Sequence, residues 1–194
     1  SVADILAKYN EYRTNSIKSL PFGKHDSLST LHKRMKKQRP DVNLNDYFIF
    51  TTISNPWKRV VSLYFYQKKM RHYPFRKKPN LTFRQYVTGY KKYFRLIQKV
   101  EDFTHPNPES PKINKIIRIE DIARKLPIYL KKRCHIKINP ESFNRKKNTT
   151  HHKHYSFYYD DKTRNIVAEY FQKDIKMGNY TFQELSNKKL SAPK

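Results

Sequence analysis

Residues 47–69 have the sequence YFIFTTISNPWKRVVSLYFYQKK, and this stretch decides the fold class. Residues 47–53 are a continuous run of aromatic and β-branched residues, which is typical of a strand buried on both faces in a parallel sheet. The tripeptide Ser-Asn-Pro at 54–56 ends that strand. Trp57 then begins a helix that we expect to extend to about Lys69. A buried strand that leads directly into a helix indicates an α/β protein.

The expected helix has two faces of different character. Trp57, Val60, Val61 and Tyr64 share an apolar face, whereas Asn55, Lys58, Arg59 and Ser62 gather on a polar face. Free backbone N–H groups at such a turn, together with the helix dipole, form an anion site. Ligands in open α/β sheets bind outside the carboxyl ends of the strands. An ordinary strand–helix unit with a solvated polar face explains the same pattern without a ligand.

Two helices are expected before residue 47. Apolar residues at helical spacing predict an amphipathic helix over residues 2–13. The second helix is expected to be capped by Ser27 or Ser29 and to lead into a loop over residues 40–46. Its apolar positions are Leu28, Leu31 and Met35.

The middle of the chain predicts a helix, a strand and another helix. Thr82 and Gln85 have the spacing of a capping box for a helix over residues 83–97. A proline-containing loop over 104–112 leads to a short strand at 115–119. The next helix has Asp121 as its expected cap and Pro127 as the point where it restarts.

The remainder of the chain predicts an edge strand, a basic loop and a last helix. The edge strand is expected at residues 135–138 and the loop at 139–154. Asp160 or Asp161 caps the last helix. The residues expected to be buried by that helix are Ile166, Val167, Tyr170 and Phe171. We therefore expect one domain over residues 1–185 and a frayed tail over 186–194.

The net charge of the chain is +26, from 42 Lys and Arg against 16 Asp and Glu. Such a charge favours polyanions or an anionic cofactor as partners, and says little about the fold. A coding bias toward lysine explains the same excess without any partner. The single cysteine, Cys134, excludes an internal disulfide, and no apolar run approaches the ~20 residues of a membrane span. The histidines at 151, 152 and 154 lack the spacing of a zinc site.

Four segments, which together cover most of the chain and occur in the family's order, resemble the carbohydrate-type sulfotransferases. Residues 50–66, FTTISNPWKRVVSLYFY, resemble that family's second donor motif, R-[ND]-P-x-x-R-x-x-S. The segment Asn148 to Phe182, with YYDDKT at its centre, is similar to the family's closing segment. IIRIEDI at 116–122 resembles a strand end with the pattern R-x-E-D, and Gly-Lys-His at 23–25 resembles an element upstream of the first motif.

The resemblance implies a P-loop-like, three-layer α/β fold with a short parallel sheet flanked by helices. It implies transfer of a sulfo group from 3′-phosphoadenosine 5′-phosphosulfate to an acceptor hydroxyl, with 3′-phosphoadenosine 5′-phosphate as product and no metal. The acceptor is expected to be a saccharide or another hydroxyl compound, including anionic ones. Ser1 would end the loop around the 5′-phosphosulfate, so the first strand and the catalytic lysine are expected upstream of this sequence.

The resemblance also implies roles for single residues. His25 is the candidate general base, because histidine titrates near neutral pH; Glu120 is an alternative base or a structural partner of Arg118. Ser54 stands where the family has a phosphate-binding arginine. The positive charge of that arginine must therefore come from another residue, either Lys58 or one in the loop 145–154. The donor-binding candidates are Ser1, Ser54, Asn55, Arg59, Ser62, Thr149, Thr150 and Lys153. The resemblance implies that Ser62 and the loop of the last three bind the same group, the 3′-phosphate.

Two other functions fit the same sequence. A non-catalytic module could bind nucleic acid or acidic glycan through its charge and its interleaved aromatic residues. A degenerate sulfotransferase-like domain could have lost turnover, in keeping with Ser54. For the enzyme, nucleic acid is expected to bind only non-specifically. A cytoplasmic location is expected, with the Golgi lumen as the alternative if an anchor lies upstream.

Overall fold

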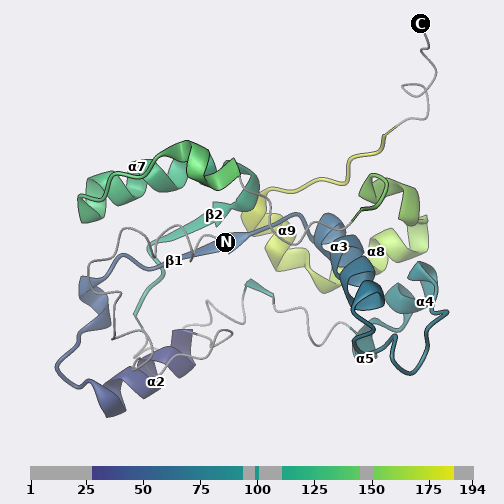
Figure 1. The fold of residues 1–194 in the computed structure, drawn as a ribbon, viewed down its shortest axis with the longest axis horizontal. Helices are drawn as coiled ribbons and strands as arrows, with labels where there is room; N and C mark the ends of the chain where they lie inside the picture. Colours follow the sequence, from purple (N-terminus) through teal and green to yellow (C-terminus); the bar gives the residue numbers. More distant parts are fainter. Residues whose placement is uncertain (1–27, 94–98, 101–110, 145–150, 186–194) are drawn as a thin grey trace, which may run out of the picture. The chain divides into compact units, whose positions relative to one another are not determined.

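A computed structural model describes residues 28–93, 99–100, 111–144 and 151–185 (Figure 1). It is a mixed α/β structure that is mostly helical, with a two-stranded parallel sheet packed among helices. This confirms the predicted class at that level. The chain divides into two compact units, described separately below: Ser1–Ile53 with Lys99–Thr149, and Ser54–Gln98 with Thr150–Lys194. The helix predicted over 2–13, most of the loop at 104–112 and the tail at 186–194 lie outside the described residues.

The first unit contains the sheet and one long helix. Its elements are α2 (Leu28–Gln38), the 3-10 helix η3 (Leu44–Asp46), β1 (Phe50–Ile53), β2 (Lys115–Arg118), the 3-10 helix η5 (Ile119–Asp121), α7 (Ile122–Cys134) and the 3-10 helix η6 (Pro140–Asn144). The predicted second helix is present as α2 and buries Met35. The expected loop at 40–46 contains η3, which Asn43 caps through its side chain.

The strands β1 and β2 pair in parallel, with Phe50 opposite Lys115 and Ile53 opposite Arg118. The Asn114 Oδ1 accepts a hydrogen bond from the Ile49 N–H at 2.6 Å and so extends the ladder by one residue. β1 begins at Phe50, three residues after the predicted start of this strand at residue 47. Only Ile53 of β1 is fully buried, so the expectation of burial on both faces is wrong for most of this strand.

Helix α7 covers the sheet through an aliphatic core (Figure 1). That core consists of Ile117, Ile122, Leu126, Leu130 and Ile138. Pro127 lies inside α7 without restarting it, contrary to the prediction. It costs the helix one backbone hydrogen bond, and the buried Leu126 and Leu130 on either side hold the helix together there.

No strand forms at 135–138, where an edge strand was predicted. His135 instead ends α7 in the left-handed conformation, with φ of 58°. The Ile136 N–H then bonds the Leu130 carbonyl at 3.2 Å, as in a helix C-cap. The alternation of Ile136 and Ile138 that suggested a strand serves to pack both residues against α7.

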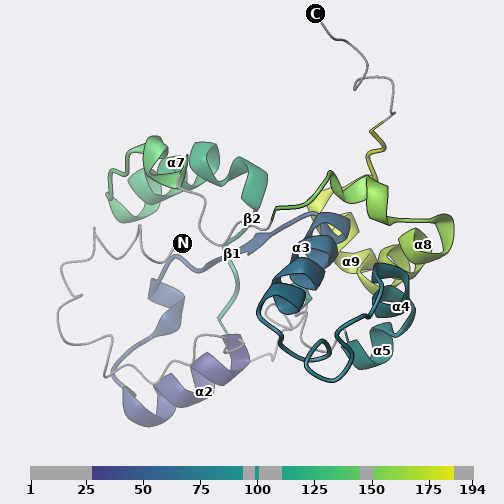
Figure 2. The ribbon, with the colours of Figure 1, turned by 45° about the vertical axis from the view of Figure 1, so that its right-hand side comes forward.

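The second unit is helical in its described residues. Its elements are α3 (Pro56–Lys69), α4 (Phe83–Thr88), α5 (Tyr90–Tyr93), the 3-10 helix η7 (Tyr155–Tyr158), α8 (Asp161–Tyr170) and α9 (Gln172–Gly178). Helix α3 has the predicted apolar face, with Trp57, Val60, Val61 and Tyr64 all buried. It packs against α4, α8 and η7 (Figure 2). The helix predicted over 83–97 is divided at Gly89 into α4 and α5.

Aromatic side chains form much of the core of the second unit. The Tyr64 ring meets Phe75, Phe83 and Tyr86 edge to face, with ring centroids 5.1–5.4 Å apart. The Tyr64 hydroxyl donates to the Leu81 carbonyl at 2.8 Å, and the Tyr86 hydroxyl donates to the Gln67 side chain at 2.9 Å. Burial raises the pKa of both tyrosines, which keeps these hydroxyls protonated as donors.

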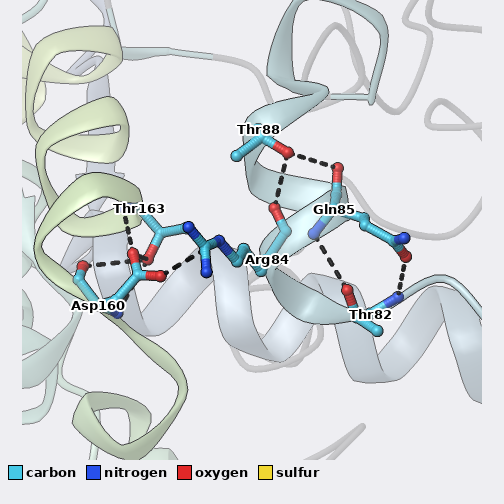
Figure 3. A network of polar contacts seen from close by, with 6 residues as sticks. All are labelled: Thr82, Arg84, Gln85, Thr88, Asp160 and Thr163. Atoms are coloured by element: carbon cyan, nitrogen blue, oxygen red, sulfur yellow. Dashed lines mark hydrogen bonds and ion pairs between the residues drawn. The ribbon is translucent and has the colours of Figure 1, made fainter.

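Both helix caps predicted in this unit are confirmed (Figure 3). Thr82 and Gln85 form the capping box of α4. Asp160, rather than Asp161, caps α8 in a second capping box with Thr163. Arg84 lies between the two boxes, with its Nε 3.5 Å from the Asp160 carboxylate. Of the residues expected on the apolar face of the last helix, Val167 and Phe171 are buried and the other two are half-buried.

We predict that Leu126→Ala lowers the free energy of unfolding by about 2–5 kcal/mol, because it leaves a cavity in the core of the first unit. Leu126 is fully buried, whereas Ile128 on the same helix is 60% exposed. Ile128→Ala is the matched control and should change stability by less than about 0.5 kcal/mol. Urea denaturation followed by circular dichroism measures both. Equal losses would show that α7 does not bury the face described here.

Candidate anion-binding site

The sequence Asn-Pro at the start of α3 forms a helix cap. The Asn55 Oδ1 accepts a hydrogen bond from the Lys58 N–H at 3.2 Å, and Pro56 occupies the first turn. Asparagine as N-cap followed by proline is a favoured way to begin a helix, because proline lacks the N–H that would have no partner there. The Asn55 side-chain oxygen is therefore used by the protein itself, and its structural role accounts for this part of the motif.

Arg59 is held by a buried carboxylate. Its Nη2 lies 2.7 Å from Oδ2 of Asp174, which is fully buried in α9. The guanidinium also lies over the Phe171 ring, 4.7 Å from its centroid. A buried carboxylate must be paired to remain charged, so this ion pair fixes α3 against α9. The Arg59 Nε is buried and has no hydrogen-bond partner among the residues described.

Ser62 lies one turn beyond Arg59 and meets the loop that precedes η7. The distance from Ser62 Oγ to His152 Nε2 is 3.5 Å, at the outer limit of a hydrogen bond. The His152 ring stacks on Phe65, with centroids 5.2 Å apart and planes at 17°, and meets the edge of Tyr158. The contact joins two segments that are 90 residues apart in the sequence.

A second histidine of this loop is held in a different way. His154 caps η7, and its Nδ1 accepts a hydrogen bond from the Ser156 N–H at 3.4 Å. Burial lowers the pKa of His154, and the nearby charge of Lys58 lowers it further. The lowered pKa favours the neutral form of His154. The effect of Lys58 on His154 also shows that the first turn of α3 lies near this loop.

The other predicted site residues have different placements. Ser54 is half-buried between β1 and α3, and Lys153 is exposed in the loop before η7. The candidates His25, Ser1, Thr149 and Thr150 lie outside the described residues. In the first unit, Glu120 Oε2 lies 3.9 Å from Arg118 Nε, which fits its structural interpretation. The second unit thus brings Lys58 and Ser62 of α3 to the loop that contains Lys153. Asn55 caps α3 and Arg59 pairs with α9 instead.

Sequence reasoning considered His152 and His154 by number only as zinc ligands, although it named their loop, 145–154, as a source of positive charge. The described residues contain no group of three or more His, Cys, Asp and Glu side chains that could hold a metal ion. A sequence signal was available, because the two histidines flank Lys153, itself a candidate. Their contacts with α3, however, depend on packing between distant segments, which composition and spacing do not reveal.

The second unit also has an open cavity of 530 Å³, which contains none of the predicted site residues. Its polar lining is partly satisfied within the protein, since the Gln85 side chain caps α4 and the Thr88 hydroxyl donates to the Arg84 carbonyl. Gly89 leaves space for the Tyr93 ring there, because a Cβ at this position would come within 2.6 Å of that ring. The lining residues are Lys78, Pro79, Asn80, Leu81, Gln85, Thr88, Gly89 and Tyr93.

Comparisons with models of known families, with curated proteins and with solved structures find no match to this chain. Within the described ranges, no helix combines the length and the apolar character needed to cross a membrane.

We predict that Arg59→Met lowers the free energy of unfolding by about 3 kcal/mol, because it leaves the Asp174 carboxylate buried without its paired charge. The fluorescence of Trp57, the only tryptophan of the chain, reports unfolding of this unit during urea denaturation. Arg84→Met is the matched control: its ion pair with Asp160 is exposed, so the loss should stay below about 1 kcal/mol. Similar losses in both variants would contradict a structural role for Arg59.

We predict that His154 makes the protein less stable as the pH falls below about 6.5. The folded state lowers the pKa of His154, so the unfolded chain binds more protons in the interval below the usual value of 6.5. The stability contributed by neutral His154 is complete above that value and is lost as the pH falls toward the lower folded pKa. His154→Asn keeps an acceptor near the position of Nδ1 and cannot be protonated.

Urea denaturation of both proteins at pH 7 and pH 5 measures the effect. The difference in stability between the two pH values should be smaller in His154→Asn. A difference that is unchanged by the substitution would show that His154 is not kept neutral in the folded protein.

Proposed function

We propose that this protein is a sulfotransferase that moves a sulfo group from 3′-phosphoadenosine 5′-phosphosulfate to a hydroxyl of a saccharide. The observation that carries the proposal is the contact between Ser62 and the loop of His152 and Lys153. The resemblance of the sequence independently assigned Ser62 and this loop to the same phosphate group. Their proximity across 90 residues is what such a shared ligand requires.

The charges of α3 suit a phosphate or sulfate group. No Asp or Glu occurs between Asp46 and Glu101 in the sequence, so α3 to α5 carry no acidic side chain. Asp174, which belongs to α9, neutralises Arg59, but Lys58 and Lys153 remain exposed at the site. Cationic side chains and a hydroxyl group form strong, charge-assisted hydrogen bonds with an oxyanion.

The proposal divides the predicted site residues between two roles. Asn55 and Arg59 position α3, while Ser62 and Lys153 contact the 3′-phosphate, with Lys58 near them. Ser54 is also assigned to the donor. The roles of Ser1, Thr149 and Thr150 at the donor and of His25 as general base stay predictions from the resemblance, because these four residues lie outside the described ranges. The P-loop-like, three-layer fold is part of the same proposal, in which the pair β1–β2 belongs to the family's parallel sheet.

We predict that this protein binds 3′-phosphoadenosine 5′-phosphate with micromolar affinity at ~150 mM salt, and that AMP binds far more weakly because it lacks the 3′-phosphate. Ser62→Ala should weaken the first affinity about tenfold, the usual effect of removing a hydrogen bond to a charged group. Ser54→Arg should tighten it by restoring a guanidinium. Isothermal titration calorimetry measures these affinities.

Ser142→Ala is the matched control, since Ser142 is a half-buried serine of the first unit, remote in sequence from the motif. Equal affinity of the wild type and Ser62→Ala would contradict the placement of the phosphate. Binding of a short random DNA duplex alone, falling steeply with salt, would instead support the polyanion-binding module that the charge of +26 favours.

A further inference from the structure

The hydrogen bonds of His152 fix which of its nitrogen atoms carries the proton. Its Nδ1 lies 2.7 Å from the Lys153 carbonyl oxygen. A carbonyl oxygen only accepts hydrogen bonds, so Nδ1 must be the donor. In the neutral ring the other nitrogen, Nε2, then has a lone pair, and this lone pair faces the Ser62 hydroxyl at 3.5 Å. His154 has the opposite tautomer, because its Nδ1 accepts from the Ser156 N–H.

Protonation of His152 would change what the site can bind. The imidazolium ring has a donor on both nitrogens, so Nε2 would become a charged N–H beside the Ser62 hydroxyl. The Ser62 hydroxyl would no longer have the Nε2 lone pair as an acceptor and could donate elsewhere. Two adjacent donors, one of them charged, suit two oxygens of a tetrahedral phosphate or sulfate.

None of the described side chains that contact the His152 ring is a carboxylate. In the described part of the chain the ring contacts Ser62 and Phe65 of α3 and Tyr158 of η7. The Tyr158 hydroxyl accepts the Lys153 N–H at 3.0 Å. The titratable groups on the described elements that contact the ring include Lys58 and Arg59 on α3 and His151, Lys153, His154 and Tyr158 on the loop and η7. Asp174 of α9 is a carboxylate that is paired with Arg59, one turn before Ser62 on α3. No Asp or Glu occurs between Glu141 and Asp160.

We infer that His152 is a titratable ligand of an oxyanion site formed with Ser62, and that it supplies the positive charge absent at Ser54. The inference rests on the proposed function for the identity of the ligand as a 3′-phosphate. Binding of the anion then favours protonation of His152, and protonation of His152 favours binding of the anion to the same extent, because coupling between two binding events is reciprocal. Histidine changes its charge between pH 5 and 8, so affinity for the oxyanion should increase as the pH falls through this interval.

The test compares wild type and His152→Gln between pH 8 and pH 5.5, with 3′-phosphoadenosine 5′-phosphate and with inorganic sulfate as probes. Glutamine reaches a similar position to Nε2 and can donate a hydrogen bond, but it does not titrate. The ratio of dissociation constants, variant over wild type, cancels the protonation of the ligand itself. We expect this ratio to rise about tenfold or more as the pH is lowered, the effect of a charged donor.

Two further variants keep the result interpretable. His152→Phe preserves the aromatic stacking on Phe65 and should show the same loss of pH dependence, even if His152→Gln folds poorly. His154→Asn removes the other histidine, which does not contact Ser62, and should keep the wild-type pH dependence of binding. Nuclear magnetic resonance of the imidazole protons would show the protonation of His152 favoured by either anion.

The outcomes separate this inference from the proposed function. A ratio that stays constant with pH for both probes would overturn the role of His152, even where 3′-phosphoadenosine 5′-phosphate binds tightly. Sulfate binding that strengthens at low pH only in proteins that keep His152, without binding of the nucleotide, would support the oxyanion site and contradict the sulfotransferase. Binding of both probes with the expected ratio supports both.

Discussion

The ion pair between Arg59 and Asp174 is the constraint on which the candidate site depends. A fully buried carboxylate remains charged only if a cation reaches it, and Arg59 is that cation at 2.7 Å. The pair fixes α3 against α9, and its stacking on Phe171 limits rotation of the helix. Ser62 follows one turn later, so its position opposite His152 is set by the same contact.

The polar residues of α3 and its N-cap therefore have two different roles. Asn55 begins α3 and Arg59 anchors it, so two polar residues of the motif are used for structure. Ser62 and Lys58 lie toward the loop before η7, where the described residues supply histidine and lysine but no carboxylate. The polar face looks uniform in the sequence, but Asn55 and Arg59 stabilise the fold, whereas Lys58 and Ser62 face the candidate binding site.

The sequence predicted those features that depend on local chemistry. The helix from 56 to 69 with its buried face and the capping boxes at Thr82 and Asp160 follow from neighbouring residues. Strands were expected at 47–53 and 115–119, whereas the parallel pairing of β1 with β2 joins residues 65 apart in the sequence. Features set by packing were missed. Pro127 remains within α7, where Leu126 and Leu130 are buried, and His135 forms a left-handed cap where alternation suggested a strand. The partner of Arg59 lies 115 residues away, and no local pattern could indicate it.

The long separation of these partners also affects how the chain folds during synthesis. The first unit has all of its described strands and α7 once residue 144 has been made. Helix α3 is synthesised early, but Tyr159, Asp174 and Phe182, which contact its Trp57 and Arg59, are among the last residues described. Tyr64, at the other end of the apolar face of α3, can pack on Phe75 and Phe83 soon after it is made. Trp57 waits 102 residues for Tyr159, so this end of the face stays uncovered for most of the synthesis of the chain.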